Sequence, residues 1–243
     1  MSDLRIDLSS IDTYAKCPRK YSYSLNLIEE VIPAGKSQLL KRIVSNAYFP
    51  LQKMGQRKTW RNSMAEIDKY CFGHVDTTND EETRSAYKES LSLIGDLKKN
   101  WYDFHYLEDS VDGISDIPVS LTLPNSVVVS DTLDLILYSK SELILCYFSN
   151  IEQPAVSLYN NIRLRGQALL LKETAKRDVT SIRYYTWINK VEVKEIKIRQ
   201  PQEFMNRTYN TIRHIVDGIR DGVFYPSVNE QCLRCPFSKK CSF

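Results

Sequence analysis

The C-terminal segment reads Cys232-Leu-Arg-Cys235-Pro-Phe-Ser-Lys-Lys-Cys241, so three cysteines follow the spacing C-x2-C-x5-C. This spacing allows three thiolates to meet at one metal or iron–sulfur centre. Cys17, near the opposite end of the sequence, can be a fourth ligand only if the two ends of the fold lie together. A centre held by Cys17, Cys232, Cys235 and Cys241 would clasp the two ends and make the whole chain one closed unit.

Three interpretations of these cysteines are open from spacing alone. Ordinary core or surface cysteines are unusual at this density beside a terminus. Structural zinc usually takes two C-x2-C pairs, whereas one half of this set is a lone cysteine. A [4Fe–4S] cluster needs one thiolate for each of its four irons. Spacing does not decide between zinc and the cluster, and the two remaining cysteines, Cys71 and Cys146, are predicted to lie in the core.

The composition narrows the classes of protein. The chain has 243 residues, 42% of them hydrophobic, which is enough for one large or two small domains. A formal net charge of +3 is compatible with nucleic acid but too weak to indicate it. The 8 glycines form no phosphate-binding motif. Because no apolar run reaches the ~18–20 residues of a membrane span and the polar start does not resemble a secretory signal, we expect a reducing compartment, cytoplasmic or otherwise intracellular, in a cell or a virus.

The hydrophobic pattern divides the chain near residue 118. Before it, Ser9 or Ser10 is expected to cap a short helix that reaches Cys17, and helical spacing recurs over 36–54, 60–67 and 87–104. After it, we expect strands at 119–123, 127–130, 132–138 and 143–149, a helix at 158–176, strands at 179–188 and 191–198, and a last helix before Pro226.

This order predicts a mixed α/β core with helices packed on a sheet, and residues 191–199 alternate as a half-exposed edge strand does. We therefore expect a single domain over 1–243. Its parts would be a mainly helical part at 1–117, an α/β core at 118–226 and a cluster-binding tail at 227–243.

The sequence around Cys17 is S-S-I-D-T-Y-A-K-C-P-R-K-Y-S-Y-S, residues 9–24. It resembles the N-terminal motif of the iron–sulfur branch of the PD-(D/E)XK nucleases, which includes RecB-like and AddB-like exonucleases and the CRISPR adaptation nucleases. In that family a first cysteine joins a distant C-x2-C-x5-C to hold a [4Fe–4S] cluster. The resemblance implies a restriction-endonuclease-like mixed sheet flanked by helices. It also implies a [4Fe–4S] cluster on the four cysteines, with structural zinc as the alternative.

The family pattern also specifies a catalytic site for magnesium or manganese. It has a glycine-x-x-x-histidine on an early helix, an aspartate on one strand, and D-Y-K or E-x-K on the next. A glutamine and a tyrosine follow on a helix. In V-V-S-D-T-L-D-L-I-L, residues 128–137, Asp134 falls on the strand aspartate, and Gln167 falls on the helix glutamine. The resemblance implies that these two positions survive.

The other catalytic positions are replaced. The D-Y-K slot reads Cys146-Tyr147-Phe148, Arg42 and Asn46 stand for glycine and histidine, and Leu171 stands for tyrosine. Cysteine is a soft ligand that does not replace a carboxylate at a hard cation, and phenylalanine carries no charge to stabilise the reacting phosphate. We therefore predict no catalytic magnesium or manganese and no nuclease activity.

A displaced carboxylate could restore the site. Asp131 lies three residues before Asp134, but on a regular strand the two side chains face opposite sides, so rescue would need a bulge. Glu142 and Glu152 lie at strand ends and could reach inward. An active single-strand DNA exonuclease is therefore the alternative to a silent nuclease fold.

A silent fold can keep a binding surface. Arg163, Arg165, Lys172 and Lys176 lie where active relatives border the nucleic-acid groove, and they could contact phosphates. A solvated charged face is the competing interpretation. We expect a cluster-bearing subunit that binds nucleic acid, DNA rather than RNA, or scaffolds a replication, repair or recombination complex. A pure protein-interaction module is the second alternative.

Overall fold

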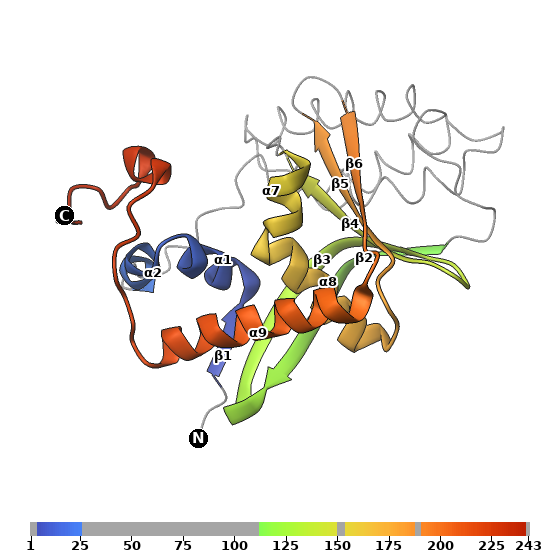
Figure 1. Cartoon of the computed structure of the whole chain (residues 1–243), viewed down its shortest axis with the longest axis horizontal. Helices are drawn as coiled ribbons and strands as arrows, with labels where there is room; N and C mark the ends of the chain where they lie inside the picture. Colours follow the sequence, from blue (N-terminus) through green and yellow to red (C-terminus); the bar gives the residue numbers. More distant parts are fainter. Residues whose placement is uncertain (1–3, 26–111, 150–153, 188–190, 242–243) are drawn as a thin grey trace, which may run out of the picture.

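The computed structural model describes residues 4–25, 112–149, 154–187 and 191–241 (Figure 1). The helices expected within residues 36–104 lie outside these ranges, as do Arg42, Asn46, Cys71 and Glu152.

The described residues contain one six-stranded mixed sheet with the order β1-β3-β4-β5-β6, in which β2 also pairs with β3. The strands are β1 (Leu4–Asp7), β2 (Asp112–Leu123), β3 (Val127–Tyr138), β4 (Leu143–Ser149), β5 (Ser181–Trp187) and β6 (Val191–Lys197). β1–β3 and β4–β5 are parallel pairs, and β2–β3, β3–β4 and β5–β6 are antiparallel pairs. This is the mixed α/β architecture that the order of elements predicts.

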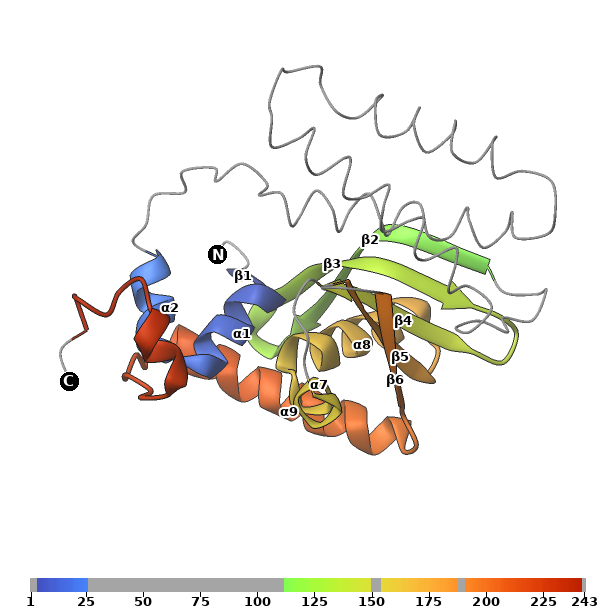
Figure 2. The same ribbon diagram turned by 90° about the horizontal axis from the view of Figure 1, so that it is seen from above.

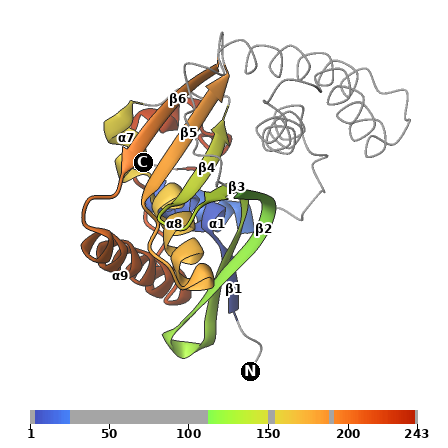
Figure 3. The same ribbon diagram turned by 90° about the vertical axis from the view of Figure 1, so that its right-hand side faces the viewer.

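The central strand β3 positions the candidate site. β2 pairs along its whole length, while β1 pairs with residues 127–130 and β4 pairs with residues 135–138. β1 and β4 must therefore share the edge of β3 opposite β2. Residues 131–134 lie between them, where no described strand pairs with that edge. Figure 3 shows β2 and β3 curving together past this point.

The described helices lie over one face of the sheet, except for α2, which lies beyond the end of the sheet (Figure 2). They are α1 (Leu8–Lys16), α2 (Pro18–Leu25), α7 (Ala155–Asn160), α8 (Ile162–Ala175) and α9 (Pro201–Arg220), with short 3-10 turns η1 (Pro124–Ser126) and η2 (Glu230–Arg234). α8 lies against the sheet and contacts both α1 and α9. A methyl group added at Gly166 of α8 would lie 2.7 Å from Leu8 Cδ2, so the α1–α8 contact depends on the missing side chain.

Local sequence explains where the helices start and stop. Asp7 caps α1 by accepting a hydrogen bond from Ser10 N at 2.7 Å, so the expected cap at Ser9 or Ser10 is wrong by a few residues. Cys17 ends α1 in an extended conformation, because the residue before a proline is disfavoured in a helix. Asn161 caps α8 through Arg163 N and Leu164 N, which divides the helix expected at 158–176 into α7 and α8.

The strand predictions are close to the structure. β4 has the expected bounds, β6 is an edge strand as expected, and the expected breaks at Pro124 and at Ser139–Ser141 separate strands. The two short strands expected before and after Asp131 form the single strand β3. β1 belongs to the sheet and β2 starts at Asp112, so strands occur within the part expected to be mainly helical. In the described part of the chain, no helix combines the length and the apolar character needed to span a bilayer.

Candidate functional site

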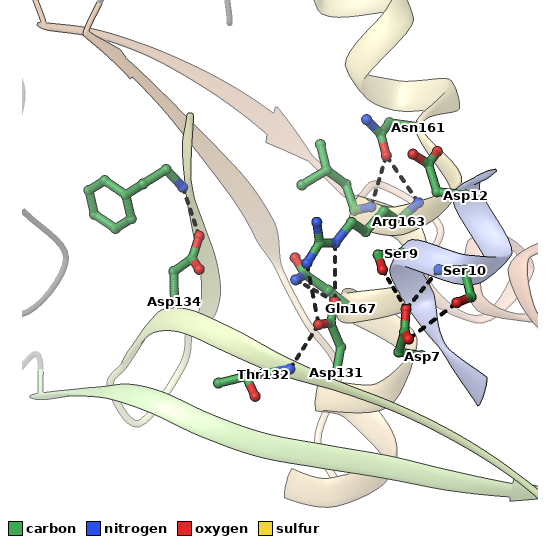
Figure 4. Close-up of polar contacts among 12 residues, drawn as sticks. Asp7, Ser9, Ser10, Asp12, Asp131, Thr132, Asp134, Asn161, Arg163 and Gln167 are labelled. Atoms are coloured by element: carbon green, nitrogen blue, oxygen red, sulfur yellow. Dashed lines mark hydrogen bonds and ion pairs between the residues drawn. The ribbon is translucent and has the colours of Figure 1, made fainter. Parts of the chain in front are cut away.

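Asp131 and α8 form the centre of the candidate site (Figure 4). Arg163 and Gln167 lie four residues apart on α8, so they present their side chains on one face. Gln167 Nε2 donates to Asp131 Oδ2 at 2.9 Å, and Arg163 Nε approaches the same oxygen at 3.3 Å. Asp131 Oδ1 accepts from Thr132 N at 2.9 Å and from Arg163 Nη2 at 3.4 Å. This carboxylate is therefore bound to protein donors through both oxygens.

Asp134 lies beside this group on the same strand. Its Oδ2 accepts a hydrogen bond from Phe148 N on β4 at 3.0 Å. In Figure 4 the carboxylates of Asp131 and Asp134 extend to the same side of β3, which differs from the opposite orientation expected for a regular strand. The physical reason is a loss of alternation in β3, because Leu133 and Ile136, three residues apart, contribute to the same core cluster. Asp116, opposite this point on β2, has a left-handed φ of 52°.

Electrostatics couple these groups. Burial acts to lower the pKa of Arg163, but Tyr147, Asp131 and Asp134 favour the guanidinium, and the net effect raises its pKa. Burial raises the pKa of Tyr147, while Arg163 acts to lower it. Arg163 is therefore a permanent cation against a half-buried pair of carboxylates.

Residues 146–148 of β4 point in different directions. Leu143 and Leu145 pack in the core cluster under α8, and Tyr147 packs with Leu158, Leu164 and Tyr184 on the helix side. Alternation along a strand then turns Cys146 and Phe148 to the opposite face. Phe148 is buried and stacks on Tyr185 with ring centres 4.8 Å apart. Tyr147 is thus the residue of this slot that faces the candidate site, which the motif comparison missed.

Cys146 is buried as predicted. Burial raises the pKa of its thiol to about 12, so it remains protonated at neutral pH. Leu171, at the position of the family tyrosine, is also buried. Glu142 lies exposed in the turn between β3 and β4, where its N–H donates to Ser139 Oγ. None of these three side chains contributes a ligand oxygen beside Asp131.

The four cations proposed for nucleic acid all have partners within the chain. Arg163 pairs with Asp131, and Arg165 donates to Thr208 Oγ1 at 3.1 Å while lying over the Phe204 ring. Lys172 Nζ lies 2.9 Å from Asp178 and 3.1 Å from Gln202, and Lys176 lies 3.4 Å from Glu173. The arginines face different neighbours, one toward the sheet and one toward α9. A role of these residues in binding nucleic acid stays a prediction.

The second candidate site is where α1 and α2, near the start of the chain, meet the C-terminal tail (Figure 1). We call the junction of α1 and α2 together with residues 223–241 the clasp. Tyr14 Oη donates to Val223 O at 2.6 Å, and Arg19 donates to Phe224 O at 2.9 Å through Nε and to Tyr225 O at 3.1 Å through its N–H. The rings of Tyr14, Tyr21 and Phe224 pack edge-on or tilted, with centres 5.7–6.3 Å apart.

Further contacts continue along the tail of the clasp. Asn229 Nδ2 donates to Lys16 O at 3.1 Å, beside Cys17. Tyr23 Oη donates to Lys240 O at 3.0 Å, and its ring lies 5.4 Å from the ring of Phe237. These bonds place the backbone next to Cys17 against the segments that carry Cys232, Cys235 and Cys241. The condition set by the sequence, that the two ends lie together, is met.

The thiols of the clasp are half-buried and form no disulfide. Cys17 Sγ accepts from Lys20 N at 3.4 Å, and Cys232 Sγ accepts from Asn229 N at 3.5 Å. Four thiols on adjoining segments suit zinc or a [4Fe–4S] cluster by donor type. Within the described ranges, however, no group of three or more histidine, cysteine, aspartate or glutamate side chains is arranged to hold a metal ion. Metal binding therefore remains a proposal.

Comparison with known proteins supports the fold. No family model matches the sequence, and no curated protein matches it. A crystal structure from Eubacterium rectale, described as a candidate exonuclease, is similar with a TM-score of 0.55 and 12% identity over 99% of this chain and 90% of that chain. The structure of SSO0001 has a TM-score of 0.46 and 12% identity over 99% and 87% of the two chains, too distant to add to the argument. The first likeness indicates a nuclease-like fold, as expected.

Proposed function

We propose that this chain is a catalytically silent member of the iron–sulfur branch of the PD-(D/E)XK nucleases. It would carry a [4Fe–4S] cluster and bind nucleic acid or scaffold a nucleic-acid-processing complex. The observation that supports silence is the chemistry of the buried side chains of Cys146 and Phe148, neither of which carries a ligand oxygen or a positive charge. A carboxylate and a lysine at these positions would be needed to hold a cation and stabilise a reacting phosphate.

Burial also prevents Cys146 and Phe148 from contributing to a cation site in any other way. The Cys146 thiol, with its pKa raised to about 12, supplies no thiolate, and the Phe148 ring is stacked on Tyr185. Asp134 is the one carboxylate at a family catalytic position, and it already accepts a hydrogen bond from β4. One carboxylate is a weak site for magnesium, which prefers several oxygen ligands in octahedral geometry.

A nuclease assay tests silence. Single-stranded and double-stranded DNA and RNA would be incubated with the protein in magnesium or manganese, with Asp134→Ala as the matched variant. We expect no cleavage above background for either protein. Manganese-dependent cleavage that Asp134→Ala abolishes would establish the alternative, an active exonuclease with a displaced site.

The cluster is the second part of the proposal. Cys17, Cys232, Cys235 and Cys241 would be its ligands, and the bound cluster would supply a cross-link between the two ends. Support comes from the donor type of the four residues and from the bonds that bring their segments together. Anaerobic purification followed by iron, sulfide and zinc analysis tests it. About four irons per chain are expected, whereas zinc alone would favour the structural alternative.

Nucleic-acid binding is the third part. Its support is the nuclease-like fold and the basic side chains on and beside α8. Filter binding with single-stranded DNA and with RNA of equal length, over a series of salt concentrations, tests it. Binding that weakens steeply with salt is expected, because phosphate contacts release counter-ions. Absent or salt-independent binding would favour a protein-interaction module.

A further inference from the structure

We propose that Arg163 is a built-in counter-ion, which occupies a place beside Asp131 and Gln167, within the electrostatic influence of Asp134, that a divalent cation could otherwise fill. The inference rests on the proposed silence of the site and adds how the site is kept closed. Arg163 is well placed for this role, because α8 holds it against β3 and its side chain is 30% exposed, compared with 10% for Asp131.

The first argument is the use of oxygen lone pairs. An ionised carboxylate offers about four acceptor positions. Asp131 receives four donors, which are Thr132 N, Gln167 Nε2 and two nitrogens of Arg163. Two of these four positions belong to the guanidinium. A cation can bind Asp131 only by displacing Arg163.

The second argument is an unpaired oxygen in the same place. Gln167 is 1% exposed, and its Oε1 has no hydrogen-bond partner. Its orientation is fixed, because Nε2 donates to Asp131 and the flipped amide would bring two acceptors together. A buried amide oxygen without a donor is rare in folded proteins. It is a neutral oxygen on the amide group that bonds Asp131.

The third argument is charge. Asp131 and Asp134 both favour the ionised form of Arg163. Removing the guanidinium would deprive the largely buried carboxylate of Asp131 of its ion-pair partner, which destabilises a protein. Carboxylate and amide oxygens are the ligands that magnesium, manganese and calcium prefer. The emptied place would therefore present a set of oxygen ligands suited to a hard divalent cation.

Replacing Arg163 should therefore make the thermal stability of the protein depend on a divalent metal ion. We expect manganese to leave the Tm of the wild-type chain unchanged. Arg163→Ala should melt at a lower temperature in chelator, and saturating manganese should raise its Tm by about 5 °C. The double variant Arg163→Ala/Asp131→Asn should lose this response. Arg165→Ala, two residues along α8 and bonded to Thr208 instead of a carboxylate, is the matched control and should not respond.

The test combines thermal unfolding with manganese binding measured by electron paramagnetic resonance. Arg163→Gln is included because it removes the charge while keeping a polar side chain. Manganese binding by the wild type that Asp131→Asn removes would overturn the proposal. So would the absence of a manganese response in folded Arg163→Ala and Arg163→Gln, or failure of both to fold even with manganese. If Arg163→Ala folds only with manganese, the proposal is supported.

This outcome is separate from that of the proposed function. Cleavage of nucleic acid by the wild-type protein would contradict the proposed absence of nuclease activity, whatever the unfolding data show. If the wild type does not cleave nucleic acid and manganese does not raise the Tm of the Arg163 variants, only the proposed counter-ion role of Arg163 is contradicted.

Discussion

The helix α1 joins two sites that are held together in different ways. At its first residue, the Asp131 site is closed by side chains that bond to each other, and both oxygens of the central carboxylate are occupied. At its last residue, the clasp is closed mainly by side chains that donate to backbone carbonyls, while the four thiols stay half-buried. The clasp therefore leaves its reactive groups available to a ligand, and the Asp131 site does not.

The two regions also differ in the atoms that they offer to a ligand. Carboxylate oxygens lie beside β3 but accept hydrogen bonds from Arg163 and Gln167, whereas the four cysteines lie on adjoining segments of the clasp and, among the described residues, are not arranged as a metal site. Each prediction below changes one of the two regions or the helices that connect them.

The largest effect is expected from removing a thiol of the clasp. Cys17→Ser or Cys235→Ser should abolish iron binding and lower stability by on the order of 3–5 kcal/mol, comparable to losing another cross-link between distant segments. Visible absorption and thermal unfolding measure the two effects. Cys146→Ala is the control, since this buried thiol should affect stability but leave the iron content unchanged. Unaltered absorption in both clasp variants would contradict the proposed ligands.

A pair of glycines on the helices tests whether the two regions are independent. A Cβ at Gly218 would lie 2.5 Å from Tyr14 Oη, whereas a Cβ at Gly166 would lie 2.7 Å from Leu8 Cδ2. Both alanine variants should lose about 1–2 kcal/mol, because overpacking outweighs the gain in helix propensity. Gly218→Ala should also speed iron loss, since it displaces the tyrosine that bonds Val223 O. Equal iron retention in the two variants would show that this bond does not support the clasp.

Most of the order of elements after residue 118 could be predicted because each element carries a local signal, whereas β1 and the start of β2 at Asp112 were not predicted. β4 is a run of apolar and aromatic residues between two turns, and β6 alternates as an edge strand does. The prediction of a single helix at 158–176 was wrong because Asn161 caps a new helix. Asparagine is a common helix cap, so the sequence does contain a signal for this break. β3 continues through Asp131, since its charge is satisfied by residues that lie more than 30 positions away in sequence.

The residue types at the candidate site could be read from the sequence, but the directions in which their side chains face could not. The sequence alone shows that positions 146 and 148 hold no carboxylate and no lysine. Tyr147 faces α8 because it packs with Leu158, Leu164 and Tyr184. β3 turns Asp131 and Asp134 to one side because Leu133 and Ile136 pack in the same core cluster. Asn229 was missed because a lone polar residue near a cysteine gives no signal of its bond to Lys16 O.

Asn229 gives a smaller test of the clasp. Its Nδ2 donates to Lys16 O and Ser227 O, so Asn229→Ala should cost about 1 kcal/mol and shorten the half-life of bound iron under a chelator. Asn206→Ala, an exposed asparagine on α9 that bonds Gln202, is the control and should retain iron as the wild type does. A loss of stability without faster iron release would mean that Asn229 stabilises the fold of the tail but does not help to retain iron.

The smallest effect is expected at Asp7, where α1 begins beside the Asp131 site. Burial acts to raise the pKa of this carboxyl, but hydrogen bonds from Ser9 and Ser10 outweigh it, and the pKa lies below its usual value of 3.8. The stability that its charge contributes is therefore present above about pH 4 and is lost as the pH falls through the lower, folded-state pKa.

Asp7→Ala should lower stability by about 0.5–1 kcal/mol at pH 7, because it removes the cap of α1. Asp7→Asn keeps a capping oxygen and should be close to the wild type at pH 7, with a weaker loss of stability below pH 4. Denaturant unfolding from pH 7 to pH 3 measures both variants. If α1 transmits strain between the two sites, Asp7→Ala should also shorten iron retention at the clasp. An unchanged half-life of bound iron would mean that α1 does not couple the two regions.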